Sequence, residues 1–247
     1  MRRFFVEPEN INDNIAHILE DARHITSVLR METGNNVILF DGTGYEYTAI
    51  LTQIDTKECL AEIYEKKFSE QEPRFDVIIF QGIPKSGKME SIIQKSVELG
   101  VSEIVPVALD RCVAKIEKGK KEEEKLKRWN KISVEAAKQC GRGKIPVVSK
   151  SVTINEALER MKNTDISIMP YEVLGHEGEK NLKYILKEKE FKTISILIGS
   201  EGGFTDSEAE KAKDAGVRLV GLGKRILRTE TVASTMLSII MYEKNEM

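Results

Sequence analysis

The stretch "TISILIGSEGGFTDSEAEKAKDAGVRLVGLG", residues 193–223, decides the fold class of this chain. It begins with an apolar, strand-like run and continues through a glycine-rich loop. A helical pattern follows, opened by the capping sequence Thr205-Asp206-Ser207-Glu208, and a second strand-like run ends the stretch. Two strands joined by a helix are typical of a crossover in a parallel sheet. The stretch therefore predicts an α/β domain.

The same alternation of strands and helices extends outward in both directions, from Phe75 to the C-terminal end. Strands are predicted at residues 76–82, 103–109, 165–172, 193–199 and 218–223, and helices at residues 88–100, 121–140, 153–161, 179–188, 206–216 and 231–244. This order predicts a mostly parallel sheet with helices on both faces.

The N-terminal part has a different pattern. Alternating apolar residues predict strands in residues 2–6, 35–55 and 58–66, and the turn sequence Asp41-Gly42-Thr43-Gly44 predicts a hairpin within the second of these ranges. One helix is predicted over residues 21–31. The polar segment "FSEQEPRFD" contains Pro73 and separates the two patterns. We therefore expect a small β-rich domain, consistent with a barrel, at residues 1–72 and an α/β domain at residues 73–247.

Composition and charge restrict the class of function. The chain has 247 residues, of which 40% are apolar and 32% charged, with a net charge of −2. No apolar run approaches the about 18 residues of a membrane span, and the three cysteines show no CxxC pairing, so we expect reduced thiols in the cytoplasm and no metal site. Residues 1–70 hold 7 Lys and Arg against 13 Asp and Glu, whereas residues 111–150 hold 13 against 5. This local basic block indicates either an anionic partner or a solvated Lys/Glu helix.

One glycine-rich segment resembles a phosphate-binding loop. In "FQGIPKSGKM", residues 80–89, Gly82, Gly87 and Lys88 have the Walker A spacing. Met89, however, stands where Ser or Thr should bind magnesium, and no acidic strand end offers a second ligand. The sequence thus argues against a nucleotide triphosphatase and leaves Lys85 and Lys88 as candidates for binding RNA phosphate.

Two later loops are better candidates for a ligand site. Gly199, Gly202 and Gly203 follow a predicted strand, where glycine lets the backbone approach a ligand closely. The second loop, "GLGKRILRTETVAS", residues 221–234, mixes Arg228, Glu230 and other charged residues with apolar ones in a way that neither a tight turn nor a solvated face requires.

These two loops carry a resemblance to a known family. "IGSEGGFTDSE" followed by "GLGKRILRTETVAS" resembles the signature of the knotted SPOUT methyltransferases, and more narrowly that of the uridine-N3 methyltransferases of small-subunit (16S) ribosomal RNA. Less specific matches occur in the expected order along nearly the whole chain, among them "LFDGTG", "KMESIIQKSVELGVSEIVPV" and "SVEAAKQCGR". Ser200 departs from the family, which usually has proline there.

The resemblance implies a fold, a cofactor and an assembly. The first domain would be a PUA-like, RNA-binding β-barrel, and the second a SPOUT domain whose C-terminal chain forms a trefoil knot. The cofactor would be S-adenosyl-L-methionine, and the protein would be a homodimer with each site near the subunit boundary. The cofactor-binding residues implied are Ile198, Gly199, Glu201, Gly202, Gly203, Leu222, Gly223, Ile226, Leu227, Thr231 and Ala233.

The chemistry implied by the resemblance requires removal of a proton, because the neutral N3 of uridine has no free lone pair. Two groups offer a proton acceptor or a stabilising cation. Arg228 and Glu230 form one; the other consists of Glu135, Gln139 and Arg142, whose i, i+4, i+7 spacing would put all three on one helical face, either at the site or in solvent. We expect catalytic roles for Arg228, Glu230, Glu135 and Arg142. The candidate RNA contacts are Arg2, Arg3, Arg23, Arg30, Lys85, Lys88, Gln139 and Arg142.

This hypothesis predicts the effects of two substitutions, and two other functions are its alternatives. Gly202→Val is expected to abolish cofactor binding by crowding the ligand, and Arg142→Ala to lower methylation while the cofactor still binds. One alternative is another knotted RNA methyltransferase acting on a ribose 2′-hydroxyl or another base. The other is a non-catalytic RNA-binding protein of ribosome assembly.

Overall fold

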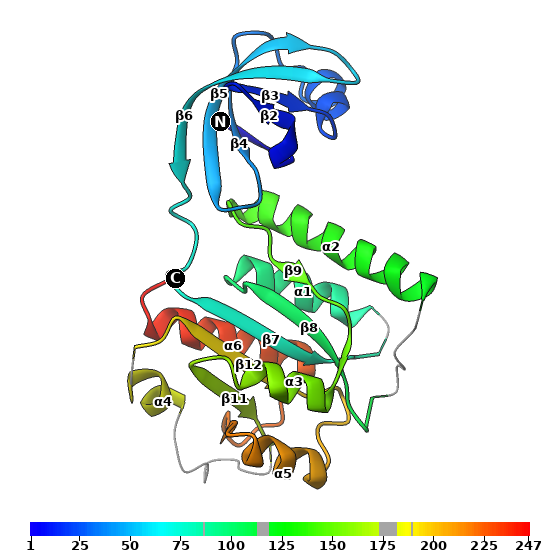
Figure 1. Ribbon diagram of the computed structural model, residues 1–247, viewed down its shortest axis with the longest axis vertical. Coiled ribbons are helices and arrows are strands. Elements are labelled where there is room, and N and C mark those ends of the chain that lie inside the picture. The colour runs from blue at the N-terminus through cyan, green and yellow to red at the C-terminus, as the bar shows by residue number, and fades with distance from the viewer. Residues whose placement is uncertain (86, 113–118, 173–181, 189) are drawn as a thin grey trace. The chain divides into compact units, whose positions relative to one another are not determined.

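The computed structural model describes all residues except 86, 113–118, 173–181 and 189, and divides into two compact units (Figure 1). The first contains Met1–Glu72 and Ala137–Ile145, and the second contains Pro73–Ala136 and Pro146–Met247. Residues 137–145, which the sequence analysis assigned to the second domain, contact the first unit. Gly44 N–H donates to the Gly143 carbonyl, and Ile145 N–H donates to the Gly42 carbonyl.

The first unit is built on a six-stranded sheet with the order β1-β4-β5-β6-β3-β2. Strand β1 runs parallel to β4, and the other pairs are antiparallel. Its elements are β1 (Arg2–Phe5), η1 (Pro8–Asn10), β2 (Ile11–Asn12), β3 (Ile15–Ile18), η2 (His24–Val28), β4 (Asn36–Phe40), β5 (Tyr45–Ile54) and β6 (Cys59–Phe68).

The predicted hairpin is confirmed, since β4 and β5 pair across the turn at Asp41–Gly44. The helix predicted over residues 21–31 is wrong in length and type. Only the five-residue π-helix η2 forms, in which Leu29 N–H donates to the His24 carbonyl, and it buries one side chain, Ile25. The short hairpin of β2 and β3 was not predicted.

The second unit contains a seven-stranded parallel sheet with the order β10-β8-β7-β12-β11-β13, in which β9 also pairs with β8. Its elements are β7 (Asp76–Gly82), α1 (Lys88–Glu98), β8 (Glu103–Ala108), α2 (Lys120–Cys140, which extends past Ala136 into the first unit), β9 (Val147–Val148), β10 (Val152–Thr153), α3 (Ile154–Met161), β11 (Ile166–Pro170), α4 (Leu182–Glu188), β12 (Thr193–Ile198), α5 (Asp206–Asp214), β13 (Arg218–Val220) and α6 (Thr229–Glu243). The predicted parallel α/β sheet is confirmed.

Helices cover both faces of this sheet. One apolar cluster packs α3 and α5 against Phe80 of β7 and Leu197 of β12, while α6 packs against α1 and also contacts β12 (Figure 1). Strand β12 lies in the centre of the sheet, and five of its six residues are buried. This placement puts the loops that follow β11, β12 and β13 at one edge of the sheet. Among the helices of the described residues, none is long and apolar enough to cross a membrane.

Candidate functional site

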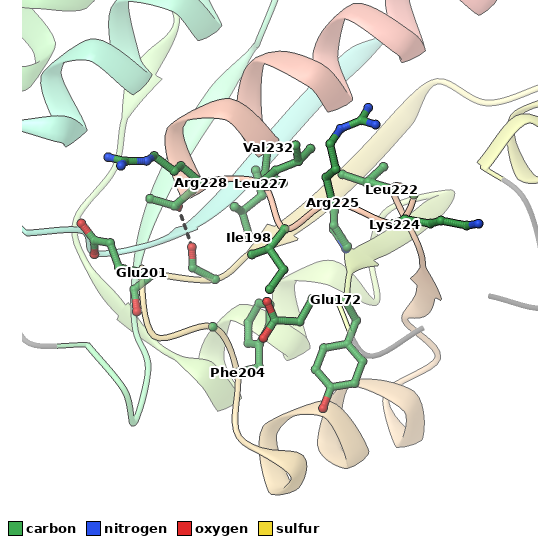
Figure 2. A pocket seen from close by; sticks show the side chains of 18 of the residues that line it. Glu172, Ile198, Glu201, Phe204, Leu222, Lys224, Arg225, Leu227, Arg228 and Val232 are labelled. Atoms are coloured by element: carbon green, nitrogen blue, oxygen red, sulfur yellow. Dashed lines mark hydrogen bonds between the residues drawn. The ribbon is translucent and has the colours of Figure 1, made fainter. Parts of the chain in front are cut away.

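A pocket of about 420 Å³ opens at the carboxyl ends of β11, β12 and β13 (Figure 2). Ligands of open α/β sheets bind at this edge, and the volume is that of a small-molecule site. The lining residues are Lys88, Pro170, Tyr171, Glu172, Ile198, Gly199, Ser200, Glu201, Gly203, Phe204, Leu222, Gly223, Lys224, Arg225, Ile226, Leu227, Arg228, Thr229 and Val232. Loops distant in sequence thus form one site.

A buried polar network joins the loops below the pocket. Thr229 Oγ1, at the start of α6, donates to the Gly199 carbonyl at 2.6 Å. Gln81, which is fully buried in β7, donates from Nε2 to Thr229 Oγ1 at 2.8 Å. These two bonds hold the end of β12 and the beginning of α6 at a fixed separation, and thereby set the width of the pocket.

The glycines of the first loop are required by space and by backbone conformation. A Cβ atom on Gly199 would lie 3.1 Å from Gly203 Cα and 3.2 Å from the Phe204 ring. Gly203 has φ +64°, a conformation that other L-residues adopt with strain. The loop can therefore form a tight turn against the pocket only with glycine at these positions.

One end of the pocket is charged. Lys88 Nζ lies 2.9 Å from a carboxylate oxygen of Glu201 and 3.5 Å from Glu230 Oε2. That Glu230 oxygen is buried and accepts no hydrogen bond from a described residue. The hydrogen bond to Glu201 raises the pKa of Lys88 above its usual value. Burial acts to raise the pKa of Glu201, but hydrogen bonds from Lys88 and from the Lys85 N–H hold it below its usual value.

Between its two charged ends the pocket is mainly apolar. Figure 2 shows Glu201 and Arg228 toward one end of the pocket and Lys224 and Arg225 toward the other, with Ile198 between them. Such a site suits a ligand with an apolar ring system and a charged terminus.

Eight of the eleven predicted cofactor residues line the pocket. They are Ile198, Gly199, Glu201, Gly203, Leu222, Gly223, Ile226 and Leu227. The other three do not. Thr231 is exposed on α6, Ala233 is fully buried in the helix, and Gly202 faces Arg111.

The physical reason given for Gly202→Val needs correction. A Cβ atom on Gly202 would lie 2.8 Å from Arg111 Cβ and 3.1 Å from the Arg111 carbonyl oxygen. A valine there would therefore clash with the segment after β8 and shift the loop, rather than enter the ligand space directly.

The sequence analysis missed several lining residues. Pro170, Tyr171 and Glu172 come from the end of β11, and Phe204 and Thr229 flank the predicted loops. The available signal was the position of Tyr171 and Glu172 at the end of a predicted strand. Its use required knowledge that β11 lies next to β12, which a single sequence does not give.

The structure does not assemble the predicted group of Glu135, Gln139 and Arg142. Helix α2 ends at Cys140, because Gly141 has φ +84° and Arg142 N–H folds back to the Ala137 carbonyl. The three side chains therefore do not share one helical face. Glu135 and Gln139 are exposed, and none of the three lines the pocket.

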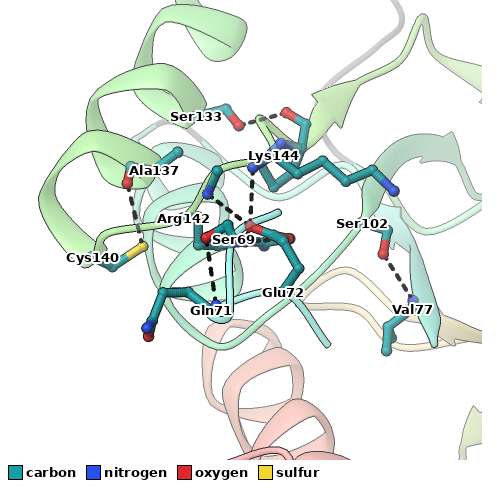
Figure 3. Close-up of polar contacts among 12 residues, drawn as sticks. Ser69, Gln71, Glu72, Val77, Ser102, Ser133, Ala137, Cys140, Arg142 and Lys144 are labelled. Carbon is teal, nitrogen blue, oxygen red and sulfur yellow. Dashed lines mark hydrogen bonds and ion pairs between the residues drawn. The ribbon is translucent and has the colours of Figure 1, made fainter. Parts of the chain in front are cut away.

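Arg142 is 3% exposed, and its guanidinium forms an ion pair with Glu72 at 2.7 Å (Figure 3). Glu72 Oε1 also accepts hydrogen bonds from the N–H groups of Gly143 and Lys144. An arginine so enclosed does not offer its charge to RNA phosphate or to a reacting base, so the predicted catalytic and RNA-binding roles of Arg142 disagree with its burial.

The other predicted RNA contacts divide into two groups. Arg2, Arg23, Arg30 and Lys85 have exposed side chains. Arg3 is held inside the first unit, where it donates to Glu46 at 2.8 Å and to the Arg142 carbonyl at 2.8 Å. Lys88 faces the pocket and its two carboxylates. We therefore interpret Arg3 as structural and Lys88 as part of the pocket.

The described residues contain no group of three or more His, Cys, Asp and Glu side chains that could hold a metal ion. The Walker-like segment is likewise not arranged as a phosphate site, because Lys88 is already paired with Glu201 and lies close to Glu230.

Comparison with known proteins shows which family models the chain matches. A family model described as an RNA methyltransferase domain matches residues 70–241, and one described as an RNA methyltransferase PUA domain matches residues 20–64. A relative from Bacillus subtilis (strain 168), named ribosomal RNA small subunit methyltransferase E, is 33% identical over 98% of this chain and 97% of its own. A relative of the same name from Mesomycoplasma hyopneumoniae (strain 232) is 33% identical over 96% of this chain and 98% of its own.

Solved structures agree with the sequence relatives. One is described as a ribosomal RNA small subunit methyltransferase E from Neisseria gonorrhoeae bound to S-adenosyl methionine. It is 31% identical, with a TM-score of 0.85, over 98% of this chain and 97% of that chain. Another is described as a putative methyltransferase from Legionella pneumophila in complex with the bound cofactor SAM. It is 30% identical, with a TM-score of 0.83, over 97% of this chain and 96% of that chain.

Proposed function

Because this chain belongs to the RNA methyltransferase family with a PUA domain, together with the relatives named ribosomal RNA small subunit methyltransferase E, we propose that it methylates N3 of a uridine in small-subunit ribosomal RNA with S-adenosyl-L-methionine. The observation that carries the proposal is the pocket at the ends of β11, β12 and β13, which joins an apolar wall to a charged end. Two similar structures are described with this cofactor bound.

The residues of the pocket fit the cofactor. Ile198, Phe204 and Leu227 offer apolar surface to an adenine ring, and the tight turn at Gly199 and Gly203 leaves backbone groups accessible. At the charged end, Lys88 and Arg228 supply cations for a carboxylate, while Glu201 supplies a carboxylate for an ammonium group. S-adenosyl-L-methionine, when bound, supplies a methyl group attached to a positively charged sulfur.

Within this proposal, Glu230 is the proton acceptor. Glu230 does not line the pocket itself, but its Oε2 lies 3.5 Å from Nζ of Lys88, which does, so a carboxylate stands next to the site beside a cation. Glu230 would accept the N3–H proton and so leave an electron pair free on N3, and the cofactor would supply the methyl group that N3 receives. Arg228, at the start of α6, stabilises the negative charge on the uracil ring.

Glu135, predicted as catalytic, is given no part in this chemistry, because it is exposed on α2 and does not line the pocket, whereas Glu230 lies beside the pocket residue Lys88. Gln139 stays a candidate for RNA contact, together with Arg2, Arg23, Arg30 and Lys85.

The proposal extends to topology, assembly and location. Threading of α6 through a trefoil knot agrees with the bond from Thr229 Oγ1 to the Gly199 carbonyl, which brings the C-terminal helix against the β12 loop. Formation of a homodimer agrees with Ile239 and Tyr242, apolar side chains exposed on α6. A substrate made of ribosomal RNA implies action in the cytoplasm.

The test measures the modified nucleoside. The full-length protein is incubated with methyl-labelled S-adenosyl-L-methionine and with small-subunit ribosomal RNA or assembled small subunits from a strain that lacks the gene. Digestion and mass spectrometry are expected to find 3-methyluridine at one position. Label on a ribose or on another base would replace the uridine-N3 proposal with another methyltransferase activity, and no label with either substrate would contradict methyl transfer.

A variant tests the proton acceptor. Glu230→Gln is expected to lower single-turnover methylation near neutral pH and to recover as rising pH supplies more uridine anion. The matched control is Glu243→Gln at the other end of the same helix, where Glu243 pairs with Lys187. A Glu230→Gln rate that stays low at every pH would assign Glu230 to cofactor binding instead.

A further inference from the structure

A row of aromatic and basic side chains lies on one face of the β5–β6 ladder in the first unit. Tyr45 pairs with Phe68 and Tyr47 pairs with Lys66 in the strand register. Residues two apart in a strand point to the same face, so the four side chains form a continuous row. We call Tyr45, Tyr47, Lys66 and Phe68 the aromatic row.

Two members of the row are large apolar side chains that face water. Phe68 is 59% exposed and Tyr45 is 40% exposed, and their rings meet edge to face with centroids 5.7 Å apart. Grouped exposed aromatic surface of this kind marks a site of interaction.

Lys66 brings a cation to the same place. Its ammonium lies 4.3 Å from the centroid of Tyr45 and 5.3 Å from that of Tyr47, within the range of cation–π attraction. The structure gives Lys66 no ion pair with a described carboxylate. The positive charge is thus held in position but is not neutralised.

The backbone holds the Phe68 ring in place. Gly44 has φ +107°, and a Cβ atom there would lie 2.9 Å from Phe68 Cε2. The ring consequently rests directly on the main chain at Gly44. A surface that is already ordered loses less entropy when a partner binds.

A second cavity adjoins the row. About 440 Å³ in volume, it is lined by Pro8, Ile11, Asp13, Asn14, Asp41, Tyr47, Ile63 and Lys66, so it shares Tyr47 and Lys66 with the row. Tyr47 donates from its hydroxyl to Asp41 Oδ2 at 2.7 Å. Asp13 and Asp41 disfavour a phosphate inside this cavity, whereas their oxygens and the Asn14 side chain can face the polar edge of a base.

The opposite face of the same strands has a different character. There Thr48 donates to Glu65 and Glu46 is paired with Arg3. Among the pairs from Tyr45–Phe68 to Thr48–Glu65, exposed aromatic rings and a lysine without an ion pair to a described carboxylate occur together only on the face of the aromatic row.

We propose that the aromatic row binds one unpaired nucleotide of the RNA, with its base stacked on Tyr45 and Phe68 and its phosphate at Lys66. This inference rests on the proposed function, which supplies the RNA partner. Aromatic side chains bind unstacked bases in single-stranded RNA, and a nearby lysine contacts the backbone.

The test separates stacking from charge. Binding of a fluorescent small-subunit ribosomal RNA transcript to the full chain is measured at several salt concentrations. Phe68→Ala and Tyr45→Ala are expected to weaken binding by about 5- to 150-fold, the range for a lost base stack, without changing the salt slope. Lys66→Met is expected to lower the slope of log affinity against log salt by about 0.7 to 0.9.

Three controls keep the outcome decisive. Tyr64→Ala removes another exposed aromatic side chain of β6, one outside the row that bonds to Asn36, and should bind as the unaltered protein does. Phe68→Trp should restore binding, because it restores stacking, and urea unfolding checks that each variant is folded. Binding by Phe68→Ala and Tyr45→Ala equal to that of Tyr64→Ala would overturn the row as an RNA site, as would failure of Phe68→Trp to rescue.

The methylation assay separates this inference from the proposed function. If the unaltered protein methylates RNA and the row variants bind normally, only the row is excluded. If the unaltered protein binds RNA through the row but transfers no methyl group to any substrate, the proposed function fails and the binding site stands.

Discussion

At the scale of single residues, the pocket depends on side chains that restrain one another. Lys88 lies between Glu201 and Glu230, and Glu201 also accepts from the Lys85 N–H. The Glu230 oxygen that faces Lys88 is buried. The charge pattern of the pocket is therefore set by the positions of α1, the loop after β12 and α6 together, and each charge can be tested alone.

The Glu201 carboxylate gives a prediction about pH. Its pKa lies below the usual 4.5, so the folded state favours the ionised form. The resulting stabilisation is present above the pKa of the unfolded chain and is lost as the pH falls through the lower folded pKa. The difference in unfolding free energy between the unaltered protein and Glu201→Gln should therefore be largest above about pH 4.5 and shrink below it. Urea unfolding between pH 3 and pH 7 measures it. A difference independent of pH would mean that ionised Glu201 contributes nothing.

Gly82, at the end of β7, gives a steric prediction. A Cβ atom on Gly82 would lie 2.6 Å from Leu109 Cδ1 and 2.7 Å from the Ser200 backbone nitrogen. Gly82→Ala must therefore displace the loop that follows β12, at a cost of about 1 to 3 kcal/mol, and should weaken cofactor binding as well. Calorimetry with S-adenosyl-L-methionine and urea unfolding measure the two effects.

The control for this substitution is Gly87→Ala, five residues later. Gly87 has φ +82°, but no atom lies within 4 Å of the position of its Cβ. Its substitution should cost about 1 to 2 kcal/mol through backbone strain and leave the affinity for the cofactor unchanged. If both variants lost the same affinity, the clash with Ser200 would not explain the weaker cofactor binding of Gly82→Ala.

At the scale of elements, α5 shows how a helix start supports the site. Thr205 and Glu208 form a capping box, and the buried Glu208 side chain also accepts from the Asp110 N–H at 2.9 Å. Thr205→Ala should destabilise the protein by about 1 kcal/mol and lower cofactor affinity, because Phe204 and Gly203 precede it in the pocket.

A second capping box supplies the matched control. Thr153 caps α3 in the same way, with Glu156 at the third position, and lies outside the pocket. Thr153→Ala should show a similar loss of stability in urea with unchanged binding of S-adenosyl-L-methionine. If both variants lost affinity equally, the effect would reflect general destabilisation rather than the position of α5.

Elements with strong local signals could be predicted from the sequence. Helices α1 and α5 carry regular apolar spacing, with Gly100 after one and a capping box before the other, and strand β7 matches its predicted range. The hairpin of β2 and β3 could not, since its strands have two and four residues and its turn uses Asp13 and Asn14 with positive φ. The π-helix η2 was mistaken for an α-helix because Ile25, Val28 and Leu29 have helical spacing in either form.

Sequence reasoning could find only those parts of the candidate site that lie within a single loop. The glycines and apolar residues of the two loops are visible in the sequence, whereas the wall formed by Tyr171 and Glu172 depends on the order in which strands enter the sheet. The group of Glu135, Gln139 and Arg142 failed for a local reason, because Gly141 ends the helix before the third residue.

At the scale of the whole molecule, the chain leaves the first unit and later returns to it. Residues 137–145 pack with Met1–Glu72. The ion pair between Arg142 and Glu72 joins these two segments of the first unit. Both side chains are about 95% buried, with exposures of 4% and 5%. A buried pair of this kind is costly to break from one side, because the remaining charge has no partner.

Arg142→Ala, for which the sequence predicted only lower methylation with the cofactor still bound, is therefore expected to destabilise the first unit by about 3 to 5 kcal/mol. The chain contains a single tryptophan, Trp129, which belongs to the second unit, so its fluorescence follows that unit alone. Far-ultraviolet circular dichroism follows both units. In urea, Arg142→Ala should move the circular dichroism transition to lower concentration and shift the Trp129 transition less, because two units need not unfold in one step.

Arg128→Ala, on α2, is the matched control. Arg128 pairs with Glu90 but is 63% exposed, so its loss should cost no more than about 1 kcal/mol. The double variant Arg142→Met, Glu72→Gln removes both charges and should recover part of the stability that Arg142→Ala loses, since no uncompensated carboxylate is left. Identical shifts of both transitions in Arg142→Ala would show that the two units unfold together. Unchanged transitions would mean that the pair contributes no net stability, and would reopen a direct role for Arg142 in RNA binding.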